Sequence, residues 1–148
     1  MLANEMTEKE RMIRRLIKEA LHAREFSYAP YSGYCVGAAL LTQEGEIYTG
    51  CNIENAAYSP TNCAERTAFF KAVSEGRKHF IAIAVAGGPN GKTITQYAYP
   101  CGVCRQVMME FCDPKEFEVI SAKSENEYEI RPLEAYLPYG FGPANIAD

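Results

Sequence analysis

Long apolar runs are missing from this sequence. The N-terminal segment carries charged residues, namely Glu5, Glu8, Lys9 and Glu10, where a signal peptide needs an apolar core. No segment approaches the roughly 20 apolar residues that a membrane-spanning helix requires. The sequence therefore argues against export and against a membrane partner, and we expect a cytoplasmic protein.

Clustered positive charge is missing as well. Lys and Arg number 15 against 19 for Asp and Glu, which gives a formal net charge of -4, and the basic residues are scattered along the chain. Nucleic-acid binding depends on clustered Lys and Arg that neutralise phosphates. We therefore expect no nucleic-acid partner, and a small, uncharged substrate fits the composition better.

Internal repeats, low-complexity tracts and domain linkers are also absent. Apolar residues make up 47% and charged residues 23% of the chain, which is an ordinary globular composition. A chain of 148 residues is long enough to bury about 70% of its unfolded surface in one core. We predict a single domain that spans residues 1–148.

Hydrophobic periodicity predicts the elements of an α/β fold. Thr7 and Glu10 form a capping-box pattern before apolar residues at helical spacing, which predicts a helix from about Glu8 to Arg24. Short apolar segments bounded by turn residues predict strands, and the next periodic segments predict helices. The strands are expected at residues 36–41, 47–53, 80–86, 117–121 and 127–131, and the helices at residues 64–75, 102–112 and 132–136.

The order of these elements indicates how they assemble. Strand-helix-strand crossovers within one sheet are right-handed almost without exception. We therefore predict an α/β fold with a mixed five-stranded sheet between helical layers. Residues 89–97 are expected to form a polar loop.

Two short segments, Cys63-Ala64-Glu65 and Pro100–Cys104, carry the clearest chemical signal. Each lies where a helix is predicted to begin, so three thiols are offered from two helix N-termini, by Cys63, Cys101 and Cys104. Unpaired N–H groups and the helix dipole at such ends favour thiolate over thiol, and thereby metal binding. Without an export signal, cysteines more often serve metal or redox chemistry than disulfides. We predict zinc.

The number of cysteine ligands favours one kind of zinc site. Structural sites use four protein ligands, whereas catalytic sites use three and leave the fourth position to water. Glu65 lies two residues after Cys63, where its carboxylate can reach the fourth position without coordinating the metal. This is the position of a proton shuttle. Either Arg66 or the N–H groups of the helices are expected to hydrogen-bond the sulfurs and so to offset the charge of three thiolates.

The segments Cys63–Arg66 and Pro100–Gln106 resemble the zinc signature of the cytidine deaminase family, which combines a non-ligating Glu with a Pro-Cys-x-x-Cys. The resemblance is to the small members with three cysteine ligands, which are typically homotetramers. It extends over nearly the whole chain, through residues 28–32, 36–40, 50–59, 137–138 and 141–143. It implies a three-layer α/β/α fold and one Zn2+ per subunit.

The resemblance also implies a reaction and residue roles. The reaction is the hydrolytic deamination of cytidine and deoxycytidine to uridine and deoxyuridine with release of ammonia, in pyrimidine salvage. Asn52 and Glu54 would grip the ribose hydroxyls, and Tyr34 would stack on the base. Ala64 and Glu65 would read the polar edge of the base. Glu65 would take a proton from the zinc-activated water, pass it to N3, and then protonate the leaving amine.

Two aromatic residues match family positions that approach the site of a neighbouring subunit. They are Tyr58 and Phe141. The resemblance therefore implies active sites that are shared across the interfaces of a homotetramer. Taken alone, Phe141 also fits a simple anchor for the C-terminal tail.

Three positions near the predicted site depart from the family pattern. Tyr34 stands where Phe is usual, Pro60 precedes the first ligand where Pro is unusual, and Tyr99 stands where Ser is common. The Tyr34 hydroxyl needs a partner or water if the ring is buried. Because Tyr99 could narrow the pocket near the leaving ammonia, a modified cytosine nucleoside such as an aminonucleoside antibiotic is an alternative substrate.

Other interpretations of the cysteines stay open at this point. Cys101 and Cys104 alone also match a thioredoxin-like redox pair. A structural zinc in a noncatalytic binding module would take a fourth ligand from Cys35, Cys51 or Cys112, although each of these looks more like a core residue.

Several polar residues also have purely structural interpretations. Asn52 and Glu54 fit a strand end with turn-forming residues, and Arg66 fits an exposed helix position. His22 and His79 lie far from the two motifs in sequence, and we interpret them as surface or boundary residues.

Overall fold

The computed structural model describes residues 5–147, and its elements follow the predicted order. Within this range the helices are α1 (Glu8–Ala23), α2 (Ala64–Ser74), α3 (Gly102–Phe111) and α4 (Leu133–Tyr136), and the strands are β1 (Tyr34–Thr42), β2 (Ile47–Cys51), β3 (Phe80–Pro89), β4 (Glu118–Ser124) and β5 (Glu127–Pro132). Short 3-10 turns lie at Arg24–Phe26 and Pro143–Asn145. Across residues 5–147, no helix is both long and apolar enough to cross a membrane.

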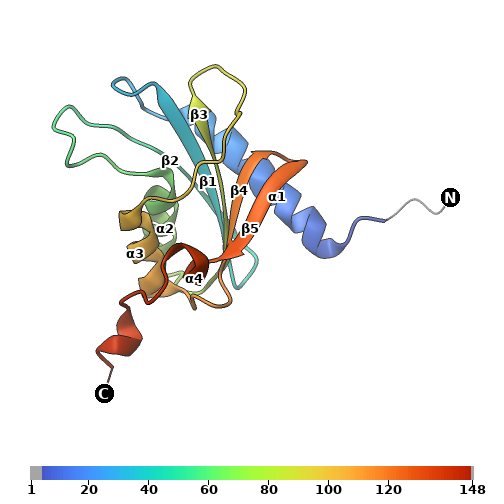
Figure 1. Cartoon of the computed structure of the whole chain (residues 1–148), viewed down its shortest axis with the longest axis vertical. Coiled ribbons are helices and arrows are strands. Elements are labelled where there is room, and N and C mark those ends of the chain that lie inside the picture. The colour runs from blue at the N-terminus through green and yellow to red at the C-terminus, as the bar shows by residue number, and fades with distance from the viewer. Residues whose placement is uncertain (1–4, 148) are drawn as a thin grey trace.

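The strands form one mixed sheet in the order β2-β1-β3-β4-β5 (Figure 1). β3 and β4 are parallel, and the other neighbouring pairs are antiparallel. A parallel pair needs a long crossover, which the segment that contains α3 supplies. The predicted mixed five-stranded sheet is confirmed for the part of the chain that the structure describes.

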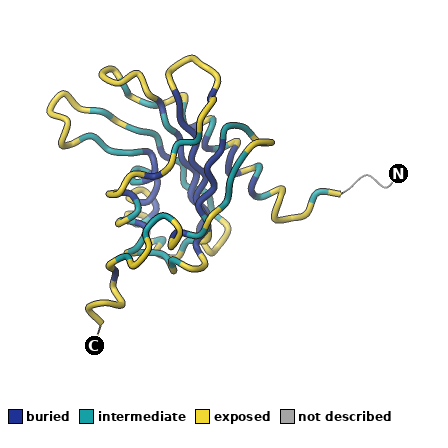
Figure 2. The backbone as a smooth tube through the Cα atoms, viewed as in Figure 1, coloured by how far each residue is buried: buried dark blue, intermediate teal, exposed yellow. Residues whose placement is uncertain are grey.

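Helices cover both faces of this sheet (Figure 1). On one face, α1 buries Leu16 and Ile17 against sheet residues such as Ile120. On the other face, α2 and α3 enclose a second cluster whose largest fully buried side chains are Phe69 and Phe117. The buried part of the chain is centred on the sheet strands between these layers (Figure 2). The three-layer α/β/α architecture is therefore confirmed.

Two glycines allow the helices to lie close to the sheet. A Cβ atom at Gly37 would stand 1.9 Å from the carbonyl oxygen of Ala20 in α1. A Cβ atom at Gly50 in β2 would stand 2.3 Å from the carbonyl oxygen of Ala64. Because Ala64 is the first residue of α2, Gly50 helps to set how deeply the Cys63–Glu65 segment sits.

Residues 89–97 differ from the polar loop that the sequence predicts. β3 continues to Pro89 because Gly87 and Gly88 pair with Val36 and Cys35 of β1. Ile94 is only 8% exposed and packs into the cluster beneath α1. The Gly-Gly-Pro sequence is typical of a turn, but pairing with a longer β1 keeps it in the sheet.

Candidate active site

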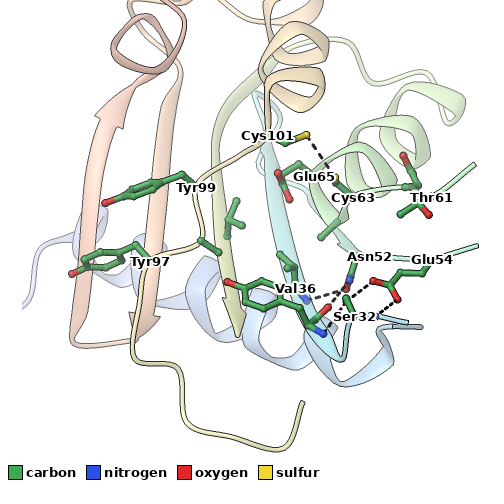
Figure 3. Close-up of a pocket in the computed structure, with 15 residues that line it drawn as sticks. Ser32, Val36, Asn52, Glu54, Thr61, Cys63, Glu65, Tyr97, Tyr99 and Cys101 are labelled. Atoms are coloured by element: carbon green, nitrogen blue, oxygen red, sulfur yellow. Dashed lines mark hydrogen bonds between the residues drawn. The ribbon is translucent and has the colours of Figure 1, made fainter. Parts of the chain in front are cut away.

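The N-termini of α2 and α3 bring together the three predicted zinc ligands. Cys63 is the N-cap residue of α2, Cys101 is the N-cap residue of α3, and Cys104 lies in the first turn of α3. Their Sγ atoms all lie within 4.8 Å of one another, and the Cys63 and Cys101 Sγ atoms are 3.7 Å apart (Figure 3). Two motifs separated along the chain therefore converge on one point.

This group of sulfurs fits a zinc ion. Zinc bonds cysteine sulfur at about 2.3 Å in tetrahedral geometry, which puts sulfurs roughly 3.8 Å apart. The 3.7 Å separation of Cys63 and Cys101 agrees with that requirement. Among the described residues, no further His, Cys, Asp or Glu joins the group, so Cys35, Cys51 and Cys112 lie outside it. Three protein ligands are the number typical of a catalytic zinc site.

Hydrogen bonds stabilise negative charge on the Cys63 sulfur. The bond from Cys104 is the main factor that lowers the pKa of Cys63 to about 5, although burial opposes it, and Arg66 also contributes. Arg66 Nη2 donates to Cys63 Sγ at 3.3 Å. The same Cys63–Cys104 bond raises the pKa of Cys104, since the proton is held there. Cys63 is therefore held as a thiolate, whereas Cys104 must release its proton when a metal binds.

The Cys101 sulfur also accepts a hydrogen bond, and a neighbouring arginine holds its segment in place. The backbone N–H of Cys104 donates to Cys101 Sγ at 3.5 Å, which is the N-cap interaction of α3. The Arg105 Nε donates to the Pro100 carbonyl at 2.7 Å, and its Nη1 donates to the Tyr136 carbonyl at 2.7 Å. Arg105 therefore ties the segment that carries Cys101 to α4.

Glu65 is a buried carboxyl group next to the sulfurs. It is 4% exposed and lies beside Cys63 at the wall of the cavity described below (Figure 3). Burial raises the pKa of Glu65 to about 7, and the charge of Cys63 adds to this effect. A carboxyl group with such a pKa can accept and donate protons near neutral pH.

A cavity of about 590 Å³ opens beside the cysteines and Glu65. Its volume is in the range of small-molecule sites. Seven of the sequence-predicted residues line it, namely Tyr34, Asn52, Glu54, Cys63, Ala64, Glu65 and Cys101. The other lining residues are Ser32, Val36, Thr61, Asn62, Val85, Tyr97, Ala98 and Tyr99.

Asn52 and Glu54 already make hydrogen bonds within the chain. The Asn52 amide accepts from the Val36 N–H at 2.9 Å and donates to the Tyr34 carbonyl at 2.8 Å. The Glu54 carboxylate accepts from the Tyr31 and Ser32 N–H groups at 3.0 and 3.1 Å. The structural interpretation of this pair, as polar residues at a strand end, thus describes a real part of their role.

Tyr58 and Phe141 do not line this cavity. Tyr58 is 73% exposed, has a left-handed φ of 61°, and packs edge-on against Tyr31. Phe141 is 59% exposed, and its carbonyl oxygen accepts a hydrogen bond from Gln106 Nε2 at 2.8 Å. Within one chain, neither aromatic side chain reaches the metal-binding group.

The three departures from the family pattern have simple structural settings. Tyr34 is 39% exposed, so its hydroxyl can be hydrated by solvent. Pro60 lies in an exposed turn whose backbone bond runs from the Thr61 N–H to the Tyr58 carbonyl, so its missing N–H is not needed. The Tyr99 hydroxyl donates to Glu129 Oε2 at 3.0 Å, and its ring extends away from Glu65 (Figure 3). Tyr99 therefore lines the wall of the cavity and does not narrow the space over the cysteines.

Ser32, Tyr97 and Ala98 also line the cavity, although no sequence motif predicts them as parts of the site. Tyr97 and Ala98 enter it because residues 92–101 run back from the end of β3 toward α3. Their position immediately before Pro100-Cys101 was the available signal. Ser32 lies within residues 28–32, which resemble the family, but only the fold brings it next to Glu54.

Comparison with known proteins connects this geometry to a family. Residues 7–120 match the family described as the cytidine and deoxycytidylate deaminase zinc-binding region. A cytidine deaminase from Sporosarcina psychrophila is 57% identical over 135 residues, which cover 91% of this chain and 95% of that protein. One from Halalkalibacterium halodurans is 46% identical over 133 residues, covering 90% and 96%.

Solved structures agree with these sequence relatives. The crystal structure of cytidine deaminase from Burkholderia pseudomallei has a TM-score of 0.77 and 43% identity, and covers 92% of this chain and 100% of that one. The structure of cytidine deaminase from Mycobacterium tuberculosis has a TM-score of 0.71 and 35% identity, covering 86% and 95%. The convergent cysteines, the buried Glu65 and these matches lead to one assignment: the chain belongs to the cytidine and deoxycytidylate deaminase zinc-binding family.

Proposed function

We propose that this protein catalyses the zinc-dependent hydrolytic deamination of cytidine and deoxycytidine to uridine and deoxyuridine, with release of ammonia, as in pyrimidine salvage. One observation carries the proposal. A buried carboxyl group, Glu65, lies beside a three-cysteine group in a cavity that also exposes Asn52 and Glu54. The first two features suit hydrolysis at an amidine carbon, and the polar pair suits a sugar. The cytidine deaminase names of the relatives support the same substrate.

Cys63, Cys101 and Cys104 would hold one zinc ion per subunit. When bound, zinc would act as a Lewis acid that lowers the pKa of a water molecule toward neutrality. Arg66 would hydrogen-bond Cys63 and limit the negative charge of the ligand set. Burial lowers the pKa of the Arg66 guanidinium, but bonds to Cys63 and Cys104 outweigh burial and raise it overall, so Arg66 stays charged.

Glu65 would perform the proton transfers. We assign to it the transfer of one proton from the attacking water to N3 of the cytosine ring. After attack at C4, it would take the proton that remains on the new hydroxyl group and pass it to the departing amine, which leaves as ammonia. These steps need a group that is ionised at one stage and protonated at the next, and a pKa of about 7 suits both.

The other cavity residues would bind the nucleoside. Tyr34 would stack on the base, because its ring forms part of the cavity wall. Ala64 and Glu65 would read the polar edge of the base. The Asn52 amide would donate its remaining N–H to a ribose hydroxyl, and the Glu54 carboxylate would accept a hydrogen bond from one. Each would use the hydrogen-bonding capacity that its bonds within the chain leave free.

We also propose a homotetramer whose active sites are completed across interfaces by Tyr58 and Phe141. Large apolar side chains of α2, α3 and the flanking segments are exposed, which supports burial against other copies of the chain. They include Tyr58 at 73%, Phe70 at 48%, Val103 at 57% and Phe141 at 59% exposure. The chain would act as one domain. Six cysteines without a disulfide support a reducing, cytoplasmic location.

Ammonia release from a panel of substrates tests the proposal. Purified protein is assayed with cytidine, deoxycytidine, cytosine and a cytidine nucleotide, before and after zinc is stripped. We expect release from the two nucleosides only, lost on stripping and restored by zinc. Release that persists in zinc-free protein would contradict the metal dependence. No release from any of the four compounds would favour a modified nucleoside or a noncatalytic zinc module instead.

A further inference from the structure

Ser32 lies at the centre of the hydrogen bonds around Glu54 (Figure 3). Its backbone N–H donates to Glu54 Oε1 at 3.1 Å, and its hydroxyl donates to Glu54 Oε2 at 2.5 Å. One residue thus contacts both oxygens of the carboxylate, which fixes the plane and direction of the Glu54 side chain.

The same hydroxyl also holds Tyr34. Ser32 Oγ accepts a hydrogen bond from the Tyr34 N–H at 3.0 Å. On the other side of that residue, the Tyr34 carbonyl accepts from Asn52 Nδ2 at 2.8 Å. Two cavity residues, Ser32 and Asn52, therefore hydrogen-bond the backbone of Tyr34 on its two sides, and Ser32 also bonds Glu54.

The backbone around Ser32 is fixed by a turn. Gly33 has a φ of 66°, a left-handed conformation that side chains other than glycine rarely adopt. The Gly33 N–H donates to the Ala29 carbonyl at 3.0 Å, and the Gly33 carbonyl accepts from the Asn90 N–H at 2.8 Å. These bonds tie the turn to the end of β3, so Ser32 has a defined position before any substrate binds.

These contacts leave the Glu54 carboxylate with few free sites at which to accept hydrogen bonds from a ligand. An ionised carboxylate has about four acceptor sites. The Tyr31 N–H, the Ser32 N–H and the Ser32 hydroxyl occupy three of them, two on Oε1 and one on Oε2. The hydroxyl bond is the main factor that lowers the pKa of Glu54, so the group stays ionised and accepts strongly. One acceptor site, on Oε2, remains for a ligand.

We propose that Ser32 is a positioning residue for sugar recognition. It orients Glu54 so that Oε2 accepts a hydrogen bond from a single ribose hydroxyl. Because the same Ser32 hydroxyl also bonds the Tyr34 N–H, it fixes the position of Glu54 relative to Tyr34 in the cavity wall. This inference rests on the proposed function, because it needs a nucleoside in the cavity. Ser32 acts through Glu54 and Tyr34 and is not assigned any contact with the reacting atoms.

The experiment compares Ser32→Ala, Ser32→Thr and the control Ser27→Ala in the zinc-loaded protein. Ser27 lies in the same segment, but its hydroxyl donates to the Val36 carbonyl and touches neither Glu54 nor Tyr34. KM and kcat are measured by ammonia release with cytidine, 2′-deoxycytidine and 3′-deoxycytidine. Glu54→Gln is measured with the same three substrates. The analogue whose KM it changes least lacks the hydroxyl that donates a hydrogen bond to Glu54.

We expect Ser32→Ala to raise the KM for cytidine about tenfold, the size of a lost hydrogen bond to a charged group, with kcat within about twofold. The loss should shrink for the analogue identified by Glu54→Gln. Ser32→Thr, which keeps the hydroxyl, should recover most of the affinity. Ser27→Ala should match the unchanged protein.

An equal loss for all three substrates overturns the inference, because it shows an effect that does not depend on one ribose hydroxyl. A fall in kcat at unchanged KM overturns it as well, because it shows an effect on the chemical step and not on sugar binding. Thermal unfolding of each variant is recorded so that destabilisation is recognised. If the unchanged protein deaminates none of the three nucleosides, the proposed function fails and the inference falls with it. Normal turnover with no effect of Ser32→Ala removes the inference alone.

Discussion

The two halves of the cavity are built in different ways. The reactive half carries the cysteines and Glu65, and the open half lies around Glu54, where we propose that the sugar binds. Cys63, Glu65, Cys101 and Cys104 come from two helix N-termini of one chain, and Glu65 and Cys104 are almost fully buried. The open half, around Glu54, is formed by loops and strand ends and is exposed to solvent. One chain therefore brings all the proposed reactive groups together, whereas the open half of its cavity is exposed to solvent.

The difference follows from what each half must do. Reactive groups must be held close together, and rigid helix ends packed on a sheet achieve this with short local motifs. An enclosure must open to admit a nucleoside, and exposed loops with few buried contacts allow such movement. The proposed assembly would close the open half with residues from another subunit.

The largest expected effect comes from Glu65→Gln, which alters the reactive half alone. The amide keeps the volume of the side chain but cannot transfer protons, so we expect kcat to fall by about 10²- to 10⁴-fold. Zinc content should stay at one per subunit, because Glu65 is not assigned as a ligand. Ammonia release, metal analysis and thermal unfolding check these expectations.

The matched control for this variant is Glu110→Gln. Glu110 is an exposed residue of α3 and does not line the cavity, so its substitution should leave kcat unchanged. A Glu65→Gln protein with near-normal kcat would remove Glu65 from the proton transfers and would end the proposed mechanism.

The reactive half is also the part that the sequence predicts well. Cys63 and Glu65 are two residues apart at a helix start, so their proximity is local and needs no knowledge of the fold. Cys101 and Cys104 likewise share one helical turn. The meeting of the two motifs is predicted from the metal-binding chemistry of three thiols at helix starts and from the family resemblance, because nothing in either motif alone specifies that α2 and α3 begin side by side.

The sequence predicts most elements to within a few residues. The first helix, for example, ends at Ala23 and not at Arg24, a difference within normal end fraying. The continuation of β3 to Pro89 was missed, because it depends on pairing with Tyr34 and Cys35 rather than on local propensity. The contact of Ser32 with Glu54 joins residues 22 apart in sequence, which no periodicity reveals.

An intermediate effect is expected from Arg66→Gln, which tests how the reactive half is supported. The variant loses the bond from Arg66 Nη2 to Cys63 Sγ and the positive charge that favours the thiolate. Groups that support metal ligands typically contribute 10- to 100-fold to affinity or activity, and we expect a loss of about tenfold or more in zinc affinity. Competition with a chromophoric chelator measures it without reference to turnover.

Arg15→Gln provides the comparison, since Arg15 is an exposed residue of α1 on the opposite face of the sheet. It should bind zinc like the unchanged protein. Equal zinc affinity in both variants would mean that Arg66 is an ordinary helix residue and that the backbone N–H groups alone stabilise the thiolates.

The smallest effect is expected from Phe141→Ala, which tests whether the open half is completed by another subunit. Within one chain the ring is 59% exposed, so its removal should cost little stability and should not reach the cavity. If a neighbouring copy uses it, KM should rise by about 5- to 10-fold, the contribution of an aromatic contact, with kcat nearly unchanged. Ile146→Ala, another exposed apolar residue of the tail, should leave KM unaltered.

Mixed assemblies separate this explanation from a local one. Phe141→Ala subunits carry an intact Glu65, and Glu65→Gln subunits carry an intact Phe141 but lack turnover. When the two proteins are unfolded and refolded together, any turnover comes from Phe141→Ala sites. Their KM should return toward the normal value only if Phe141 reaches them from the partner. A KM that stays raised in the mixture, or light scattering that shows an active monomer, would mean that Phe141 anchors its own tail and that each chain encloses its own substrate.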